Sequence, residues 1–179
     1  MNRTSLIRLG GIAAVVGSVV YTVFGLLVPF LEPMFFVLLA LGAMVATVAL
    51  HALHRERYGL PGMFASLTVI IGVVLILGSN LGLAEGLPWP LPERIFMVSV
   101  LVAALGMVAL GIATIAAGLL PWWCGVALIV GGIGFVRPML ALPWTGFFMG
   151  LLTGAAWAVV GYALLRAGSR RFEQPSRVR

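Results

Sequence analysis

The chain has 179 residues, of which 62% are hydrophobic and only 9% are charged, and its mean hydropathy is +1.17. Soluble domains are about 45–50% apolar and about 25% charged, so a soluble globular domain is excluded and lipid is the expected solvent. The formal net charge of +6 does not indicate a nucleic-acid partner, because the basic residues stand at the ends of apolar segments and not in a cluster on a polar face.

Six apolar segments predict an all-α, polytopic membrane bundle with six transmembrane helices. The predicted spans are residues 6–28, 34–53, 63–83, 95–117, 122–136 and 144–165. Together they form one transmembrane domain over residues 1–166, followed by an arginine-rich tail over residues 167–179. The first span is too long for the apolar core of a signal peptide and has no small-residue cleavage site, which predicts an uncleaved helix.

The connections between the predicted spans differ in length and chemistry. Charged and turn-forming residues over 54–62 predict a loop between the second and third spans. The longest connection, residues 82–93, contains three alternating prolines that favour an extended path. Glu85, Trp89 and Glu93 lie in it and are candidates for contact with a partner protein, although charges in a solvated loop need no function.

Arg137 interrupts the fifth apolar segment. Either the helix ends at Val136, which we favour, or it continues through a kink at Pro138 with Arg137 partly inside the membrane. An isolated arginine here could contact an anionic lipid headgroup, a substrate carboxylate or an outer-loop glutamate. The simpler interpretation is that its side chain extends to the membrane surface.

The last helix carries a small residue at every fourth position. Gly146, Gly150, Gly154 and Ala158 therefore project from one helical face. In a bilayer such a strip lets a second backbone approach closely, which predicts a helix-packing face.

Few residues are suited to catalysis or metal binding. There is one cysteine, Cys124, and there is no lysine or aspartate, which excludes an intrachain disulfide, a cysteine metal cage and Schiff-base chemistry. His51 and His54 have the spacing of metal ligands but lack a third ligand nearby, so we interpret them as a polar cap at a helix end. No metal, cofactor or catalytic residue is predicted, and the protein is not expected to be an enzyme.

The arginines predict the orientation in the membrane. With six spans, nine arginines fall on one side: Arg3, Arg8, Arg55, Arg57, Arg166, Arg170, Arg171, Arg177 and Arg179. Two, Arg94 and Arg137, fall on the other. By the positive-inside rule both termini are cytoplasmic, and a bacterial-type cytoplasmic membrane is the expected location. A weak repeat of three helical hairpins is also visible, although sequences rich in Ala, Gly and Val align with one another easily.

Two functions fit these features. The first is a non-catalytic accessory or scaffold subunit that packs by its Gly and Ala faces against itself or another membrane subunit. The second is a small transporter or permease-like carrier of an apolar or anionic solute or lipid, with Arg137 as the candidate binding residue. Carriers usually keep polar or broken-helix sites near the membrane midplane, and no such site is evident in the sequence.

Overall fold

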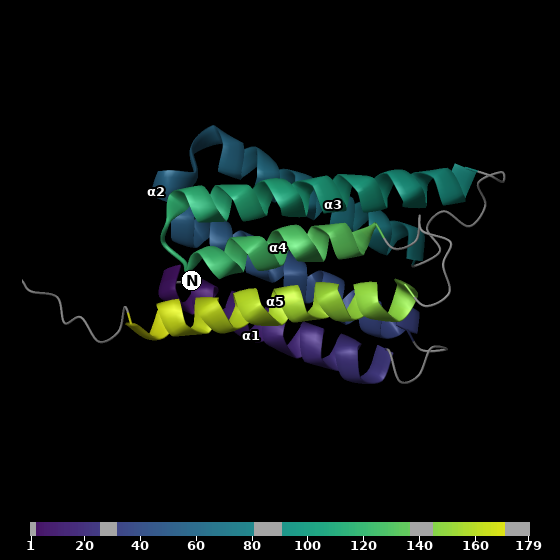
Figure 1. Ribbon diagram of the computed structural model, residues 1–179, viewed down its shortest axis with the longest axis horizontal. Coiled ribbons are helices and arrows are strands. Elements are labelled where there is room, and N and C mark those ends of the chain that lie inside the picture. Colours follow the sequence, from purple (N-terminus) through teal and green to yellow (C-terminus); the bar gives the residue numbers. More distant parts are fainter. Residues whose placement is uncertain (1–2, 26–31, 81–90, 137–144, 171–179) are drawn as a thin grey trace, which may run out of the picture.

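Helices make up every regular element that the structure describes. A computed structural model describes residues 3–25, 32–80, 91–136 and 145–170. The elements are α1 (Arg3–Val20), the π-helix η1 (Tyr21–Gly25), α2 (Glu32–Asn80), α3 (Leu91–Ala117), α4 (Trp122–Phe135) and α5 (Thr145–Arg170). They lie side by side in an elongated bundle (Figure 1). The predicted all-α fold is therefore confirmed.

Four helical segments in the described ranges are long and apolar enough to cross a membrane. They are Arg3–Val23, Phe36–Ser79, Arg94–Ala117 and Gly150–Ser169. Helix α4 is also apolar, but its 14 residues extend only about 21 Å, less than the hydrocarbon core of about 30 Å. The chain thus has the features of a multi-pass membrane protein.

Helix α2 consists of two arms joined at Gly59. This residue has φ 55° and ψ −159°, a combination that is essentially restricted to glycine. The chain reverses direction there, and the second arm runs back along the bundle (Figure 1). The expected loop over residues 54–62 was wrong, because the helix continues to Tyr58 and resumes directly after Gly59. Charged residues do not end a helix by themselves, and Pro61 is tolerated in the first turn of the second arm.

Most other helix ends lie within a few residues of the prediction. In the first predicted span, residues 6–28, the α-helix ends at Val20 and a π-helix continues to Gly25. Residues 26–28 of that span and 81–83 of the third lie outside the described residues. Helix α3 begins at Leu91, four residues early, because Pro92 suits a first helical turn. It is followed by Gly118, whose φ of 62° is typical of a residue that terminates a helix. Helix α4 ends at Phe135. Helix α5 continues to Arg170, so the start of the predicted tail is helical.

Neighbouring helices approach most closely at glycines. A Cβ atom added to Gly161 of α5 would lie 2.8 Å from the carbonyl oxygen of Gly11 on α1. Gly111 of α3 and Gly125 of α4 face each other, and an added Cβ on either would lie 2.5 Å from the other's carbonyl oxygen. Such contacts let helices pack by close backbone approach, which matters in lipid because apolar burial drives association only weakly there.

The core lies between the helices, and apolar residues also cover the outside. Trp157, Leu50 and Met107 are among the largest fully buried side chains. On α1 the exposed residues Leu9, Ile12, Val16 and Val19 form one apolar outer face. An outer surface of this kind is stable against lipid, whereas in water it would expose a large hydrophobic patch.

Candidate functional site

One end of the bundle holds the start of α1, the kink of α2, the α3–α4 turn and the end of α5 (Figure 1). Here Arg3 donates hydrogen bonds to the carbonyl oxygens of Ala52, at 2.8 Å, and Leu53, at 3.2 Å. Arg57 donates to the carbonyl oxygen of Ala117 at 3.2 Å. Ala117 is the last residue of α3, where carbonyl groups lack a helical partner and attract cations. Hydrogen bonds from Arg3 and Arg57 therefore connect different helices at this end of the bundle.

A buried polar cluster connects the α2 kink to α3. The rings of His54 and Tyr58 stack with centroids 4.5 Å apart and an interplanar angle of 6°. His54 Nδ1 lies 2.9 Å from the carbonyl oxygen of Leu50, which fits a ring protonated at Nδ1. The Tyr58 and Thr114 hydroxyls are 2.8 Å apart. Because Thr114 donates its own proton to Leu110, Tyr58 is the donor, and its side chain holds the kink against α3.

The two histidines are not brought together with further metal ligands. His51 Nδ1 and His54 Nε2 are buried and have no hydrogen-bond partner in the part of the chain that is described. Within the same ranges, no group of three or more His, Cys, Asp or Glu side chains is close enough to hold a metal ion. At the kink, the rings of His54 and Tyr58 pack against each other. His54 is hydrogen-bonded to Leu50, and Tyr58 is hydrogen-bonded to Thr114.

Five buried hydroxyl groups within the described helices bond to their own backbone. Each donates to the carbonyl oxygen four residues earlier; they are those of Ser18, Thr47, Ser66, Ser99 and Thr114. The buried hydroxyl of Thr153 on α5 donates instead to the carbonyl oxygen of Gly131 on α4, at 3.3 Å. Bonds within one helix satisfy a polar side chain locally in an apolar environment. A nucleophilic hydroxyl needs a base within hydrogen-bond reach, and these six donate to backbone carbonyls instead.

The predicted glycine strip lies on α5, and its described members face the same chain. Gly150 and Gly154 are buried and Ala158 is half-buried. A Cβ added to Gly154 would collide with the side chain of Thr22 in η1. Gly146 belongs to α5, but its surroundings are outside the described part. At Gly154 the strip therefore contacts a helix of its own bundle.

The other predicted site residues are outside the described part. Arg137, Glu85 and Trp89 fall between the described ranges. Glu93 lies in the first turn of α3, and its side chain is likewise not described. Their proposed contacts with lipid, solute or a partner protein remain predictions.

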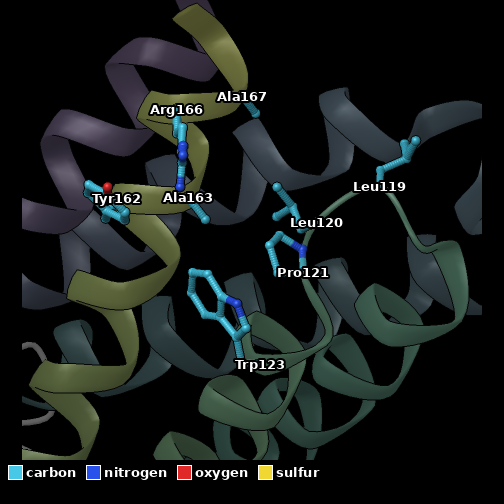
Figure 2. Close-up of a pocket in the computed structure, with 8 residues that line it drawn as sticks. All are labelled: Leu119, Leu120, Pro121, Trp123, Tyr162, Ala163, Arg166 and Ala167. Carbon is cyan, nitrogen blue, oxygen red and sulfur yellow. The ribbon is translucent and has the colours of Figure 1, made fainter. Parts of the chain in front are cut away.

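A recess that was not predicted from the sequence opens between the α3–α4 turn and the last turns of α5. Leu120, Pro121 and Trp123 line one side, and Tyr162 and Arg166 of α5 line the other (Figure 2). The recess has a volume of about 90 Å³. The recess is lined by one cation, Arg166, by two exposed aromatic side chains, Trp123 and Tyr162, and by apolar residues. Such a lining can bind an anion that also has an apolar part.

Comparisons of the chain with models of protein families, with curated proteins and with solved structures find no match. The function must therefore be argued from the helices and their contacts. The recess had a signal in the sequence: Trp123, Tyr162 and Arg166 each stand at the end of an apolar segment, where the positive-inside rule and the aromatic belt place such residues at one membrane depth. The sequence alone does not place Leu120 and Trp123 beside Arg166, because they come from a distant part of the chain.

Proposed function

We propose that this chain is a non-catalytic integral membrane protein that acts as an accessory or scaffold subunit. It crosses the membrane six times, with both termini in the cytoplasm. The observation that carries the proposal is the combination of apolar outer faces with a core whose described buried hydroxyl groups are all hydrogen-bonded within the bundle. A protein of this kind acts by binding neighbouring subunits through its outer surface and by holding them in place, and not by catalysis.

Six spans follow if the two arms of α2 each cross the membrane. Residues 32–58 and 60–80 extend about 40 Å and about 31 Å respectively, enough for a core of about 30 Å. A single span of 44 residues over Phe36–Ser79 would be about twice too long. Helix α4 is then the shortest span, which a bilayer accommodates by local thinning at modest cost.

The side that faces the cytoplasm follows from the arginines. Arg3 and Arg8 begin α1, and Arg55 and Arg57 stand beside the α2 kink. Arg166 lies near the end of α5, so these positions share one end of the bundle (Figure 1). The first turn of α3, with Arg94, lies at the opposite end. This distribution supports a cytoplasmic location for the arginine-rich end.

A partner subunit would contact the outer faces of the bundle. Gly154, Gly161 and Gly168 of α5 make contacts inside the chain, so they are not available to a partner. Exposed apolar residues remain on each side, among them Ile12 on α1, Leu105 on α3 and Ile133 on α4. Their faces are covered either by lipid or by a second subunit.

Native mass spectrometry of the protein, extracted gently from its own membrane, tests this proposal. We expect a reproducible assembly, either with a second subunit or with further copies of this chain. Single substitutions Ile12→Trp, Leu105→Trp and Ile133→Trp should identify the contact face, because only the variant on that face should lose the assembly. A stable monomer in native lipid, with no copurifying subunit, would refute the accessory role.

The alternative function is a carrier of an apolar or anionic solute or lipid, with Arg137 as its binding residue. It is motivated by six spans, the candidate hairpin repeat and an isolated cation. Among the described side chains no arginine or glutamate is buried, whereas carriers usually place charged groups along the substrate path. Unchanged uptake and efflux in an Arg137→Ala strain would remove the reason for this alternative.

A further inference from the structure

Two hollows on the α4–α5 side of the bundle meet at Trp123. The first is the recess at the end of α5 that contains Arg166 (Figure 2). The second is an apolar groove of about 310 Å³ between α4 and α5, lined on its two sides by residues such as Val126 and Leu152. Because Trp123 borders both, the recess and the groove lie next to each other along the surface. We call the two together the α4–α5 groove.

The α4–α5 groove has the length of one membrane leaflet. On α5 it follows Leu152, Ala155, Val159, Tyr162 and Arg166, which are three or four residues apart and so share one helical face. From Leu152 to Arg166 the helix rises about 21 Å. Half of a bilayer of about 40–45 Å, headgroups included, is about as long. The groove thus begins at headgroup level and ends near the membrane midplane.

The charged end of the groove lacks a counter-ion within the described part of the chain. Arg166 is exposed, and no side chain or carbonyl group in the described ranges pairs with its guanidinium. The one acidic side chain described there is Glu56, which lies 3.6 Å from Arg3. An anion for Arg166 must therefore come from beyond these residues, and the lipid phase next to the groove is rich in phosphate groups.

The chemistry at this end favours a phosphate attached to an apolar chain. A guanidinium group can donate two parallel hydrogen bonds to a phosphate. Trp123 and Tyr162, which are 38% and 57% exposed, are the residue types that prefer the headgroup level of a membrane. Below them the groove is lined by Val, Leu and Ala, which suit an acyl chain. A net-anionic lipid is favoured over a zwitterionic one, whose own cation would lie close to Arg166.

We propose that the α4–α5 groove binds one anionic phospholipid of the cytoplasmic leaflet. The headgroup phosphate pairs with Arg166 between Trp123 and Tyr162, and one acyl chain lies against Val126, Val130 and Leu152. This inference rests on the proposed six-span placement in the membrane. It does not depend on whether the protein has a partner subunit.

Native mass spectrometry of the full chain released from bilayer discs tests the site. The discs contain equal amounts of phosphatidylglycerol and phosphatidylcholine. We expect the wild-type protein to retain one phosphatidylglycerol molecule, and Arg166→Gln to retain about tenfold less, because a charge-assisted phosphate contact is lost. Arg55→Gln is the matched control, since Arg55 is an exposed arginine at the same end of the bundle but lies on α2, outside the groove. It should retain lipid like the wild type.

A second variant tests the apolar part of the groove without changing charge. Ala155→Phe should fill the space for the acyl chain and reduce retention severalfold, whereas Ala116→Phe, at an exposed position on α3, should have no effect. Adding inorganic phosphate separates the two sources of the phosphate group. Retention should persist at millimolar phosphate, because the acyl chain contributes to binding; displacement would mean a site for a free anion and would overturn the lipid assignment.

Three further results would overturn the proposal: equal loss of lipid in Arg166→Gln and Arg55→Gln, equal retention of the two lipids, or normal retention in Ala155→Phe. The same spectra distinguish a failure of the lipid site from a failure of the accessory role. A second subunit that persists in Arg166→Gln while the lipid is lost would leave the accessory role intact. Lipid retained by a monomer would contradict the accessory role and support the lipid site.

Discussion

At the scale of single residues, Tyr58 links two helices through a contact between side chains. It stacks on His54 and donates a hydrogen bond to Thr114 across the interface between α2 and α3. The tyrosine is 5% exposed, so water cannot readily replace the bond. Because Tyr58 stands immediately before Gly59, the contact holds the end of the first arm of α2 against α3.

We expect Tyr58→Phe to lower the free energy of unfolding by about 1 kcal/mol, because one buried hydrogen bond between helices is lost. Thr114 keeps its bond to Leu110, so no buried hydroxyl is left unpaired and the loss stays small. Denaturation by SDS in mixed micelles measures the effect. Tyr162→Phe is the control, since Tyr162 is 57% exposed and should change little. Equal effects of the two substitutions would show that the Tyr58 hydroxyl does not stabilise the kink.

At the scale of helices, the glycines of α5 differ in what they contact. Gly161 faces the backbone of Gly11 on α1, whereas Gly168 faces the side chain of Arg8. Backbone atoms cannot move without displacing a helix, whereas a side-chain atom such as Arg8 Cγ can shift with the helix in place. The two glycines share the same helical face, so they provide a matched pair.

Gly161→Ala should destabilise the protein by about 1–3 kcal/mol, because its methyl group would force α1 and α5 apart. Gly168→Ala should cost less than Gly161→Ala, since its methyl group meets side-chain and not backbone atoms of α1 and alanine is the better helix former. Both values come from the same SDS titration. A Gly161→Ala protein as stable as the wild type would contradict the close α1–α5 packing.

The positions of the helices could be predicted from the sequence, but the path of the chain at the α2 kink could not. Apolar segment length predicts each helix, because a backbone in lipid must satisfy its own hydrogen bonds. Gly118 predicts the end of α3 because the position needs a positive φ. The continuation of helix through residues 54–58 was missed, since the charged residues there also suit a loop. The direction change at Gly59 depends on one dihedral pair that hydropathy does not encode.

The candidate site was harder to predict than the helices. Arg166 and Trp123 are 43 positions apart in the sequence, and only the packing of α4 on α5 brings them to one recess. A single apolar helix carries no information on which neighbour it meets. The glycine strip of α5 was predicted as a packing face, but spacing alone does not distinguish a helix of the same chain from one of another subunit.

At the scale of the whole molecule, the proposal depends on the α2 kink and the α3–α4 turn facing the same side of the membrane. Six spans place both of them in the cytoplasm together with the two termini. A single crossing by α2 would instead bury the kink near the membrane midplane, with Arg55 and Arg57 beside it. Charged side chains at that depth are costly, which favours the hairpin.

The most direct test is cysteine accessibility in a Cys124→Ala background, read with a membrane-impermeant maleimide. Leu60→Cys reports on the kink, where the native side chain is 67% exposed, and Leu119→Cys reports on the α3–α4 turn, where it is 38% exposed. Gly86→Cys reports on the connection between α2 and α3. We predict that Leu60→Cys and Leu119→Cys react only in inverted vesicles and that Gly86→Cys reacts in intact cells. Labelling of Leu60→Cys from outside intact cells would contradict six spans with cytoplasmic termini.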